Sequence, residues 1–302
     1  MQEILVRAGC FVGIILLGYL MRRAGVFKES DFSVLSKIVV KITLPAAIVS
    51  SFNGKEIDPA MLGILLIGLG GGVIYMTLGF LMNRRNGREQ QAFAIINMSG
   101  YNVGNFTLPF VQSFLGPTGV IATSLFDTGN AFVCLGGAYS VASIVKGHGK
   151  FSIMKILKKL VRSVAFDCYI IMLVVTLFHI PVPSPVFSFA EIIGNANSFT
   201  AMLMIGIGFK LSGDMTQMKK ILKMITVRYS VAALIALGCY YLLPLPFEMR
   251  LALVILAFSP IASAAPAFTG DLDGDTGLAS AVNSISILCS IVIIICLLVV
   301  LL

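Results

Sequence analysis

Long uncharged apolar runs are the feature that most restricts the fold of this chain. Residues 64–82 and 288–302 contain no charged side chain, and each covers most of a bilayer thickness, which a helix crosses in about 20 residues. Of the 302 residues, 58% are hydrophobic and only 12% are charged, whereas a soluble domain carries roughly 25% charged residues. A bilayer requires this much apolar surface and a water-soluble core does not, so the sequence predicts an integral membrane protein.

Composition and motifs exclude several other classes of protein. The net charge is +8, but the basic residues lie in short runs between apolar segments without interleaved aromatic residues, so no nucleic-acid partner is expected. The six cysteines have no CxxC spacing, which predicts neither a zinc site nor a disulfide framework. HExxH, GxSxG and P-loop motifs are absent, so we expect no enzyme, no cofactor and no ATP-driven pump.

Apolar windows and helix breakers divide the chain into ten expected transmembrane helices, and no window alternates apolar and polar residues as a strand would. The first segment has Glu3 and Arg7 near its start and lacks a small-residue cleavage site, so it is expected to be a retained helix. The predicted fold class is therefore all-α integral membrane, with spans at 4–21, 32–52, 60–82, 90–115, 118–145, 158–179, 187–211, 221–243, 248–270 and 277–302.

Basic residues mark alternate connections between these segments. Positive residues collect on the cytoplasmic side of membrane proteins, so the connections after segments 1, 3, 5 and 7 are expected in the cytoplasm and both termini outside it. This predicts a multi-pass protein of the plasma (inner) membrane with the lipid bilayer as a partner. The basic clusters are Arg22, Arg23 and Lys28; Arg84, Arg85 and Arg88; Lys146, Lys150, Lys155, Lys158, Lys159 and Arg162; and Lys210, Lys219, Lys220, Lys223 and Arg228.

The longest polar connection divides the chain into two sets of five segments. Residues 1–145 form the first five-helix repeat, 146–162 a basic cytoplasmic linker, and 163–302 the second repeat. Because five is odd, the second set crosses the membrane in the opposite sense, which predicts an inverted repeat, a common plan in transporters. The linker sequence FSIMKILKKLVR is basic and amphipathic, so it is expected either along the membrane surface or as a solvated connection.

Helix-breaking residues interrupt the fourth segment of each half, at 97–109 and at 259–268. Irregular backbone at membrane depth needs a polar lining, and paired breaks at matching positions indicate a transporter binding site. Each break exposes a helix N-terminus that attracts an anion and a helix C-terminus that can hold Na⁺ or a proton donor; plain proline kinks with structural hydrogen bonds are the alternative. The expected substrate-binding residues are Asn97, Tyr101, Asn102, Asn105, Pro109, Pro260, Ser263 and Pro266.

One acidic residue lies deep in the fifth segment. Asp127 follows Thr118 by about nine residues, or roughly 13 Å along a helix, and an acid at that depth indicates function. A position near the outer surface is the alternative. Asn130 lies one turn beyond, and Asn283 is its expected counterpart in the second half, so the predicted ion-coupling residues are Asp127, Asn130 and Asn283, with Na⁺ near Asp127 as one option. Arg228 is expected only to border water at a cytoplasmic helix end.

Short motifs along almost the whole chain resemble the auxin efflux carrier family, which includes bacterial malate or malonate permeases. They are Leu44-Pro45-Ala46, the run from Asn102 to Pro109 followed by Gly116, Phe126-Asp127 with Asn130, and the proline-broken ninth segment. The resemblance implies two inverted five-helix repeats whose fourth and ninth helices cross at their breaks, within a scaffold domain and a transport domain. Unlike the plant members, the chain has no long hydrophilic central loop.

These observations predict a secondary transporter that moves small organic anions by alternating access, driven by a Na⁺ or H⁺ gradient. The expected substrate is a dicarboxylate such as malate or malonate, or an auxin-like carboxylate. The alternatives are a Na⁺-coupled symporter of bile-acid-like substrates, a cation/proton antiporter, a channel and a ligand sensor that does not transport. The small-xxx-small spacing of Gly68 and Gly72 is compatible with packing inside one chain or in a homodimer.

Overall fold

The computed structural model describes residues 2–147, 152–209 and 217–302, and in these ranges all regular structure is helical. The basic residues Lys150 and Lys210, and the part of the expected linker at 148–151, lie outside them. In the first half the elements are α1 Gln2–Arg23, α2 Asp31–Ile38, η1 Val39–Thr43, α3 Leu44–Ser51, η2 Pro59–Leu62, α4 Gly63–Met82, α5 Arg88–Met98, η3 Val103–Thr107, α6 Leu108–Phe132, η4 Val133–Gly137 and α7 Ala138–Lys146. The second half contains α8 Ile153–Leu160, α9 Val164–Leu177, α10 Ser184–Gly194, α11 Asn197–Gly208, α12 Met218–Leu242, α13 Phe247–Ala257, α14 Ala265–Asp271 and α15 Thr276–Leu301.

Six helical segments of the described ranges are long and apolar enough to cross a membrane by length and composition, and a bent pair, α8 with α9, makes a seventh if it counts as one span. The protein is therefore an all-helical, multi-pass membrane protein. Each of the ten apolar segments expected from the sequence overlaps helix in the structure. The six segments are Gln2–Arg23, Asp31–Ser51, Gly63–Met82, Arg88–Lys146, Met218–Leu242 and Thr276–Leu301.

The 59-residue segment Arg88–Lys146 folds back on itself. Gly116, within α6, has φ +60° and ψ −155°, a left-handed region that glycine adopts without steric penalty. Pro117 follows, and its preset φ suits the first turn of a new helix. Because the chain reverses here, α5 and α7 pack side by side near the other end of the segment.

Two helix boundaries differ from the prediction. The expected sixth segment, 158–179, begins too early, because α8 ends at Leu160 and α9 begins at Val164 after a bend of 81°. Ser163 caps α9 by accepting a hydrogen bond from the N–H of Phe166, and this side chain fixes the new start. The expected segment 187–211 is two helices, since α10 ends at Gly194 and α11 begins at Asn197.

The segment α8, within the expected linker, is an amphipathic helix. Its Ile156 and Leu160 are buried in a small apolar cluster with Ala131, and Phe132, Leu135 and Phe166 pack against that cluster. Lys155 and Lys158 are exposed, and the Lys159 ammonium lies 4.8 Å from the centre of the Phe268 ring. One face of α8 therefore packs on the helices and the other carries positive charge.

Glycine allows two pairs of helices to approach closely. A Cβ atom at Gly68 on α4 would collide with the Phe126 carbonyl on α6, and one at Gly129 would collide with the Leu65 carbonyl. In the same way Gly206 on α11 packs against the Ile15 carbonyl of α1. Backbone contact of this kind is typical of membrane helices, so Gly68 packs helices within one chain.

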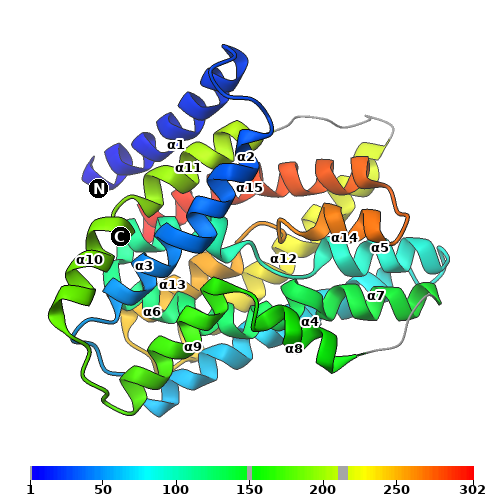
Figure 1. Cartoon of the computed structure of the whole chain (residues 1–302). Coiled ribbons are helices and arrows are strands. Elements are labelled where there is room, and N and C mark those ends of the chain that lie inside the picture. The colour runs from blue at the N-terminus through cyan, green and yellow to red at the C-terminus, as the bar shows by residue number, and fades with distance from the viewer. Residues whose placement is uncertain (1, 148–151, 210–216) are drawn as a thin grey trace.

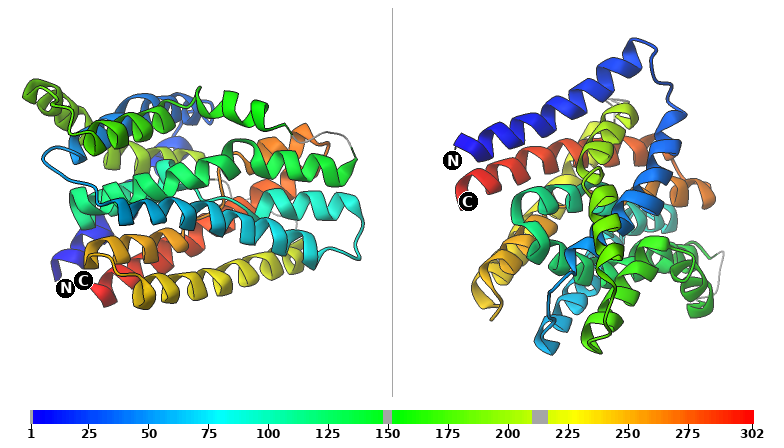
Figure 2. Two further views of the ribbon diagram at one scale, coloured as in Figure 1. Left: turned by 90° about the horizontal axis from the view of Figure 1, so that it is seen from below. Right: turned by 60° about the vertical axis from the view of Figure 1, so that its left-hand side comes forward.

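The long helices run roughly along one direction, and the two chain ends lie close together at one end of the molecule (Figure 1, Figure 2). The helices α1, α2, α3, α9, α10 and α11 form one group, in which α1 packs along α11, and α3 along α10 and α9. The helices α4, α5, α6, α7, α12, α13, α14 and α15 form the other. The two groups meet where α6 contacts α3, α9 and α11.

Candidate functional site

The two broken helices meet at their breaks. Residues 99–102 leave the helix after α5, and residues 258–264 leave it after α13. The N–H of Asn102 donates to the carbonyl of Pro260 at 2.9 Å, and the Thr107 hydroxyl donates to the Ser259 hydroxyl at 2.6 Å. Two unwound segments thus satisfy part of each other's hydrogen-bonding requirement inside the protein, where unpaired peptide groups are expensive.

Proline and glycine produce these breaks locally. Gly100 has φ +73°, and a Cβ atom there would also press on Cys134 and Ala262. Pro266 stands in the first turn of α14, where the missing N–H has no consequence. Pro109 stands at the start of α6, where the π-helix η3 passes into the α-helix. Pro266 therefore begins the helix that follows the second break, and Pro109 lies at the change of helix type after the first.

Asn130 holds the first break. Its side-chain oxygen accepts a hydrogen bond from the N–H of Tyr101 at 3.0 Å, and its side-chain nitrogen donates to the carbonyl of the same residue at 2.9 Å. Asn130 is 1% exposed, so these bonds replace the helical pairing that Tyr101 has lost. Pairing both groups of one residue with one amide makes this a specific support for the unwound backbone.

Asn283 and Ser286 on α15 hold the second break. The Asn283 amide donates to the carbonyls of Ile261 and Ala262, both at 3.2 Å. The Ser286 hydroxyl accepts from the N–H of Ile261 at 3.1 Å. The structure therefore places Asn283 at the second break in a position like that of Asn130 at the first, although two side chains share the task.

A cavity of about 160 Å³ lies beside the crossing and extends to the N-terminus of α9. It contains six of the residues predicted for substrate or ion binding. Its size is below the 300–1,000 Å³ typical of pockets for drug-sized ligands, so it suits a small ligand. The six are Tyr101, Asn102, Asn105, Asp127, Asn130 and Ser263; other lining residues include Val40, Leu44, Gly104, Cys134, Phe166 and Tyr169.

Among the described residues that line this cavity, Asp127 is the single carboxylate, and none is a lysine, arginine or histidine. One carboxylate oxygen accepts from the Asn130 amide at 2.7 Å, and the other accepts from the Tyr169 hydroxyl at 2.9 Å. Tyr169 comes from α9, so this carboxyl group links α6 to a different helix. It lies next to the first break, one turn before Asn130.

Five predicted residues lie outside this cavity. Asn97 is fully buried between α5 and α14, where its amide donates to the Thr269 hydroxyl at 2.9 Å. The carbonyl of Pro109 accepts from Ser198 of α11, and Pro260 contributes a backbone carbonyl to the crossing. The other two, Pro266 and Asn283, support the second break as described above.

The observed position of Arg228 differs from the prediction, which placed it at a helix end in contact with water. It is 1% exposed and is the largest fully buried side chain. Its guanidinium donates to the carbonyls of Met98, Gly100 and Ser259, at both breaks. The sequence signal was a lone arginine several residues inside an apolar helix, and the prediction attributed it to the neighbouring basic cluster.

A polar cluster joins the first half of α6 to α11 on the far side of the crossing from α9. The Asn197 amide donates to the Gln112 side-chain oxygen at 3.1 Å, and its own oxygen accepts from Thr43 at 3.0 Å. Ser113 and Ser198 exchange a hydrogen bond at 3.0 Å. We refer to Thr43, Gln112, Ser113, Asn197 and Ser198 as the outer polar cluster. None of them was predicted from the sequence.

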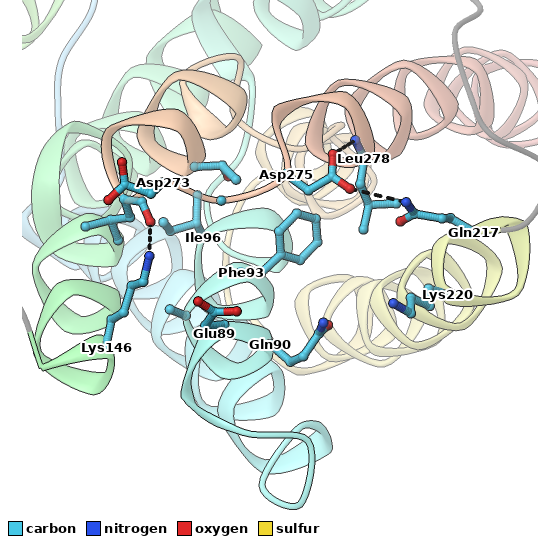
Figure 3. Close-up of a pocket in the computed structure, with 14 residues that line it drawn as sticks. Glu89, Gln90, Phe93, Ile96, Lys146, Gln217, Lys220, Asp273, Asp275 and Leu278 are labelled. Carbon is cyan, nitrogen blue, oxygen red and sulfur yellow. Dashed lines mark hydrogen bonds between the residues drawn. The ribbon is translucent and has the colours of Figure 1, made fainter.

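A second cavity, of about 200 Å³, lies away from the crossing between α5, α7, α12 and the connection from α14 to α15 (Figure 3). Its charges are mixed, with Glu89, Asp273 and Asp275 beside Lys146 and Lys220. Lys146 donates to the Leu272 carbonyl. Asp275 caps α15 by accepting from the N–H of Leu278 at 2.8 Å, and this bond, with one from Gln217, lowers the pKa of its carboxyl group.

The sequence also matches a family of known proteins. A family model described as membrane transport protein matches residues 11–298. The chain belongs to this family. It is the family of the auxin efflux carriers, so the resemblance noted in the sequence is confirmed.

A relative named an uncharacterized transporter, from Methanothermobacter thermautotrophicus (strain Delta H), is 22% identical over 172 residues. The match covers 56% of this chain and 56% of that protein. The chain therefore aligns with little more than half of that relative's length.

Proposed function

We propose that this transport protein is a secondary transporter that carries a small organic anion together with a proton by alternating access. The crossing of two broken helices beside a small cavity, with Asp127 hydrogen-bonded to both Asn130 and Tyr169, is the observation that carries the proposal. Discontinuous helices that meet inside the membrane form the substrate and ion sites of many secondary transporters.

We further propose that the chain crosses the membrane ten times, as two inverted five-helix repeats over residues 1–145 and 163–302. The hairpin at Gly116 supports two crossings within Arg88–Lys146. The proximity of the two chain ends supports an even number of crossings (Figure 2). The similar supports of the two breaks, by Asn130 and by Asn283 with Ser286, favour two related halves. With the basic connections in the cytoplasm, both termini lie outside it.

The anionic nature of the substrate follows from the backbone that lines the cavity. Residues Asn102 to Asn105 include the start of η3, whose first N–H groups have no partner within the helix and give that end a positive partial charge. The Asn105 side-chain oxygen has no hydrogen-bond partner within the described residues, so it is available to accept a bond from a hydroxyl or a protonated carboxyl group of the substrate. Malate, malonate and auxin-like carboxylates are the substrates to test first.

A proton on Asp127 makes a carboxylate substrate compatible with this cavity. Two negative charges about 5 Å apart repel by roughly 3 kcal/mol at an effective dielectric constant of 20, and no basic side chain of the described ranges lines the cavity. Substrate and proton are therefore expected to bind together. The titratable groups around Asp127 are Tyr101 at the break, Tyr169 on α9 and Cys134 on η4, with the buried cation Arg228 behind the break.

The two ends of the interface between the helix groups differ, and the difference supports an inward-facing state, in which the cavity lies toward the cytoplasm. The cavity reaches Ser163 and Phe166 beside the basic segment α8, on the expected cytoplasmic side. The outer polar cluster joins α6 to α11 beyond the crossing. Opening to the other side would break this cluster, and the Asp127–Tyr169 hydrogen bond would break when the helix groups move apart.

Uptake into proteoliposomes tests the proposal. Radiolabelled malate, malonate and indole-3-acetate are supplied while a pH gradient and a Na⁺ gradient are imposed separately. We expect saturable uptake of at least one carboxylate, stimulated by the pH gradient. No saturable flux of any organic anion would refute the proposed transport, and high-affinity binding without counterflow would instead indicate a sensor.

Cation/proton antiport is the second candidate, because Asp127 is the single charged side chain that the described part of the chain contributes to the cavity. It predicts that external cations release protons from the liposomes without any organic anion. A bile-acid-like substrate is less favoured, since a steroid acid needs more room than about 160 Å³.

A further inference from the structure

Arg228 is a buried cation at the depth of the crossing. It stands ten residues after Met218, the start of α12, or about 15 Å along the helix, and it is 1% exposed. A charged side chain at such a depth is expensive unless it is paired or serves the transport path. No carboxylate within the described residues forms an ion pair with it.

The partners of Arg228 are the C-terminal ends of two helices. Met98 is the last residue of α5, and Gly100 follows it in the unwound stretch; the guanidinium donates to the carbonyls of both, at 2.8 Å for Gly100. It also donates at 3.2 Å to the carbonyl of Ser259, just beyond α13. Carbonyls at a helix C-terminus lack helical partners and carry negative partial charge, so one guanidinium neutralises both ends.

Two tyrosine rings hold the guanidinium in place. Its carbon lies 4.5 Å from the ring centre of Tyr75 and 5.2 Å from that of Tyr101, distances that favour cation–π attraction. The Tyr75 hydroxyl donates to the backbone carbonyl of Arg228 at 3.1 Å. The charge is thus fixed by contacts from α4, the first break and the second break.

We infer that Arg228 is a resident cation that takes the place of Na⁺ at the crossing, so that the transport cycle needs no sodium ion there. In transporters with broken helices, unwound carbonyls and helix C-termini coordinate Na⁺. Here such carbonyls already accept N–H bonds from a covalently attached positive charge. The inference rests on the proposed function, which it deepens by excluding one of the two coupling ions.

Asp127 and Arg228 act on the same unwound segment, residues 99–102, but have separate roles. Arg228 reaches the unwound segment through the Gly100 carbonyl, whereas Asp127 reaches it through Asn130, which binds Tyr101. The fixed charge lies behind the break and the exchangeable proton lies at the cavity. A positive charge behind the backbone also favours a carboxylate in front of it.

Sodium binding to the purified protein tests this inference without a transport substrate. Binding of ²²Na⁺ and the melting temperature are measured in NaCl and in choline chloride of equal ionic strength. For the wild type and for Arg228→Lys, which keeps a cation, we expect no saturable ²²Na⁺ binding and equal melting temperatures. For Arg228→Ala, which frees the carbonyls, we expect Na⁺ to raise the melting temperature by several degrees. Arg250→Ala, which removes another arginine that donates to a carbonyl, should show no such gain.

Saturable ²²Na⁺ binding by the wild type would overturn the inference, and this measurement stands even where Arg228→Ala does not fold. A folded Arg228→Ala protein that is indifferent to Na⁺ would also overturn it, because the carbonyls would then not form a latent cation site. A wild type that binds no Na⁺ but moves no organic anion would refute the proposed function alone, since Na⁺ binding is measured without substrate.

Discussion

The two breaks of this transporter solve the same backbone problem with different chemistry. At the first, Asn130 alone pairs the N–H and the carbonyl of Tyr101 and also donates to Asp127. At the second, Ser286 accepts from Ile261 and Asn283 donates to two carbonyls. Three residues before Asn283 stands Ser280, which bonds only within its own helix. Support for unwound backbone is therefore present at both breaks, whereas, within the described residues, the supporting amide bonds to a carboxyl group only at the first.

The largest expected loss of stability comes from removing the side chain of Asn130, which supports the first break. Asn130→Ala leaves the N–H and carbonyl of Tyr101 and one oxygen of Asp127 without their partner. At about 1–3 kcal/mol for each unsatisfied buried group, we expect a loss of about 3–9 kcal/mol of unfolding free energy, seen as a lower melting temperature in detergent. Asn283→Ala, which leaves two carbonyls unpaired, should lose about two thirds as much, and Ser280→Ala serves as the control. Equal losses for the two asparagine variants would contradict the comparison.

Asp127→Asn tests whether ionisable chemistry resides in the first half. A pH gradient of one unit supplies about 1.4 kcal/mol for one coupled proton, so wild-type accumulation of substrate should rise about tenfold. The variant should fold and bind substrate but show no such rise, because its amide cannot release a proton. Ser280→Ala, at the matching place in the second half, should keep the response. Unchanged gradient dependence in Asp127→Asn would remove Asp127 from the coupling mechanism.

Tyr169→Phe separates holding the carboxyl group from carrying the proton. The change removes one hydrogen bond to Asp127 at 2.9 Å, which is worth about 1–3 kcal/mol when the partner is charged. We expect a melting temperature lower by a few degrees, with the accumulation driven by the pH gradient retained. Loss of gradient dependence as complete as that of Asp127→Asn would show that Tyr169 itself takes part in coupling.

Ser286→Ala tests whether two side chains share the support of the second break. It leaves the N–H of Ile261 unpaired, which should lower the unfolding free energy by about 1–2 kcal/mol. The double variant Asn283→Ala with Ser286→Ala should then lose at least as much unfolding free energy as Asn130→Ala loses by leaving the N–H and the carbonyl of Tyr101 unpaired. Thermal unfolding of the single and double variants measures this, and a double variant no weaker than either single one would argue against a shared task.

The smallest expected effect concerns Asp275, which caps the helix that carries Asn283 and Ser286. Asp275→Ala should lower stability by about 1 kcal/mol at neutral pH. Because hydrogen bonds from Leu278 and Gln217 lower the pKa of Asp275, its contribution is present above the ordinary carboxyl pKa and is lost as pH falls through the lowered one. Unfolding of wild type and variant should therefore converge only in strong acid. A difference that persists there would exclude this cause.

Much of the helical layout could be predicted from the sequence, because the bilayer imposes rules that act along the chain. Uncharged runs predicted where the helices lie, and glycine with proline predicted both breaks. Asp127 and Asn130 are three residues apart, so they face each other on one helix, and their hydrogen bond follows from spacing alone. The start of α9 and the division between α10 and α11 were missed, since the Ser163 cap and the close contact of Gly194, at the end of α10, with the Ala47 backbone on α3 give weak signals.

Tertiary structure decided the rest, because it alone brings distant segments together. Whether Arg228 faces water or the crossing depends on how α12 is rotated against α5 and α13, and its partners Met98 and Gly100 are far away in the chain. Tyr169, Ser286 and the outer polar cluster likewise gain their roles from partners on other helices. The sequence by itself determined that the backbone must break at two places, and packing determined which side chains satisfy the groups that the breaks expose.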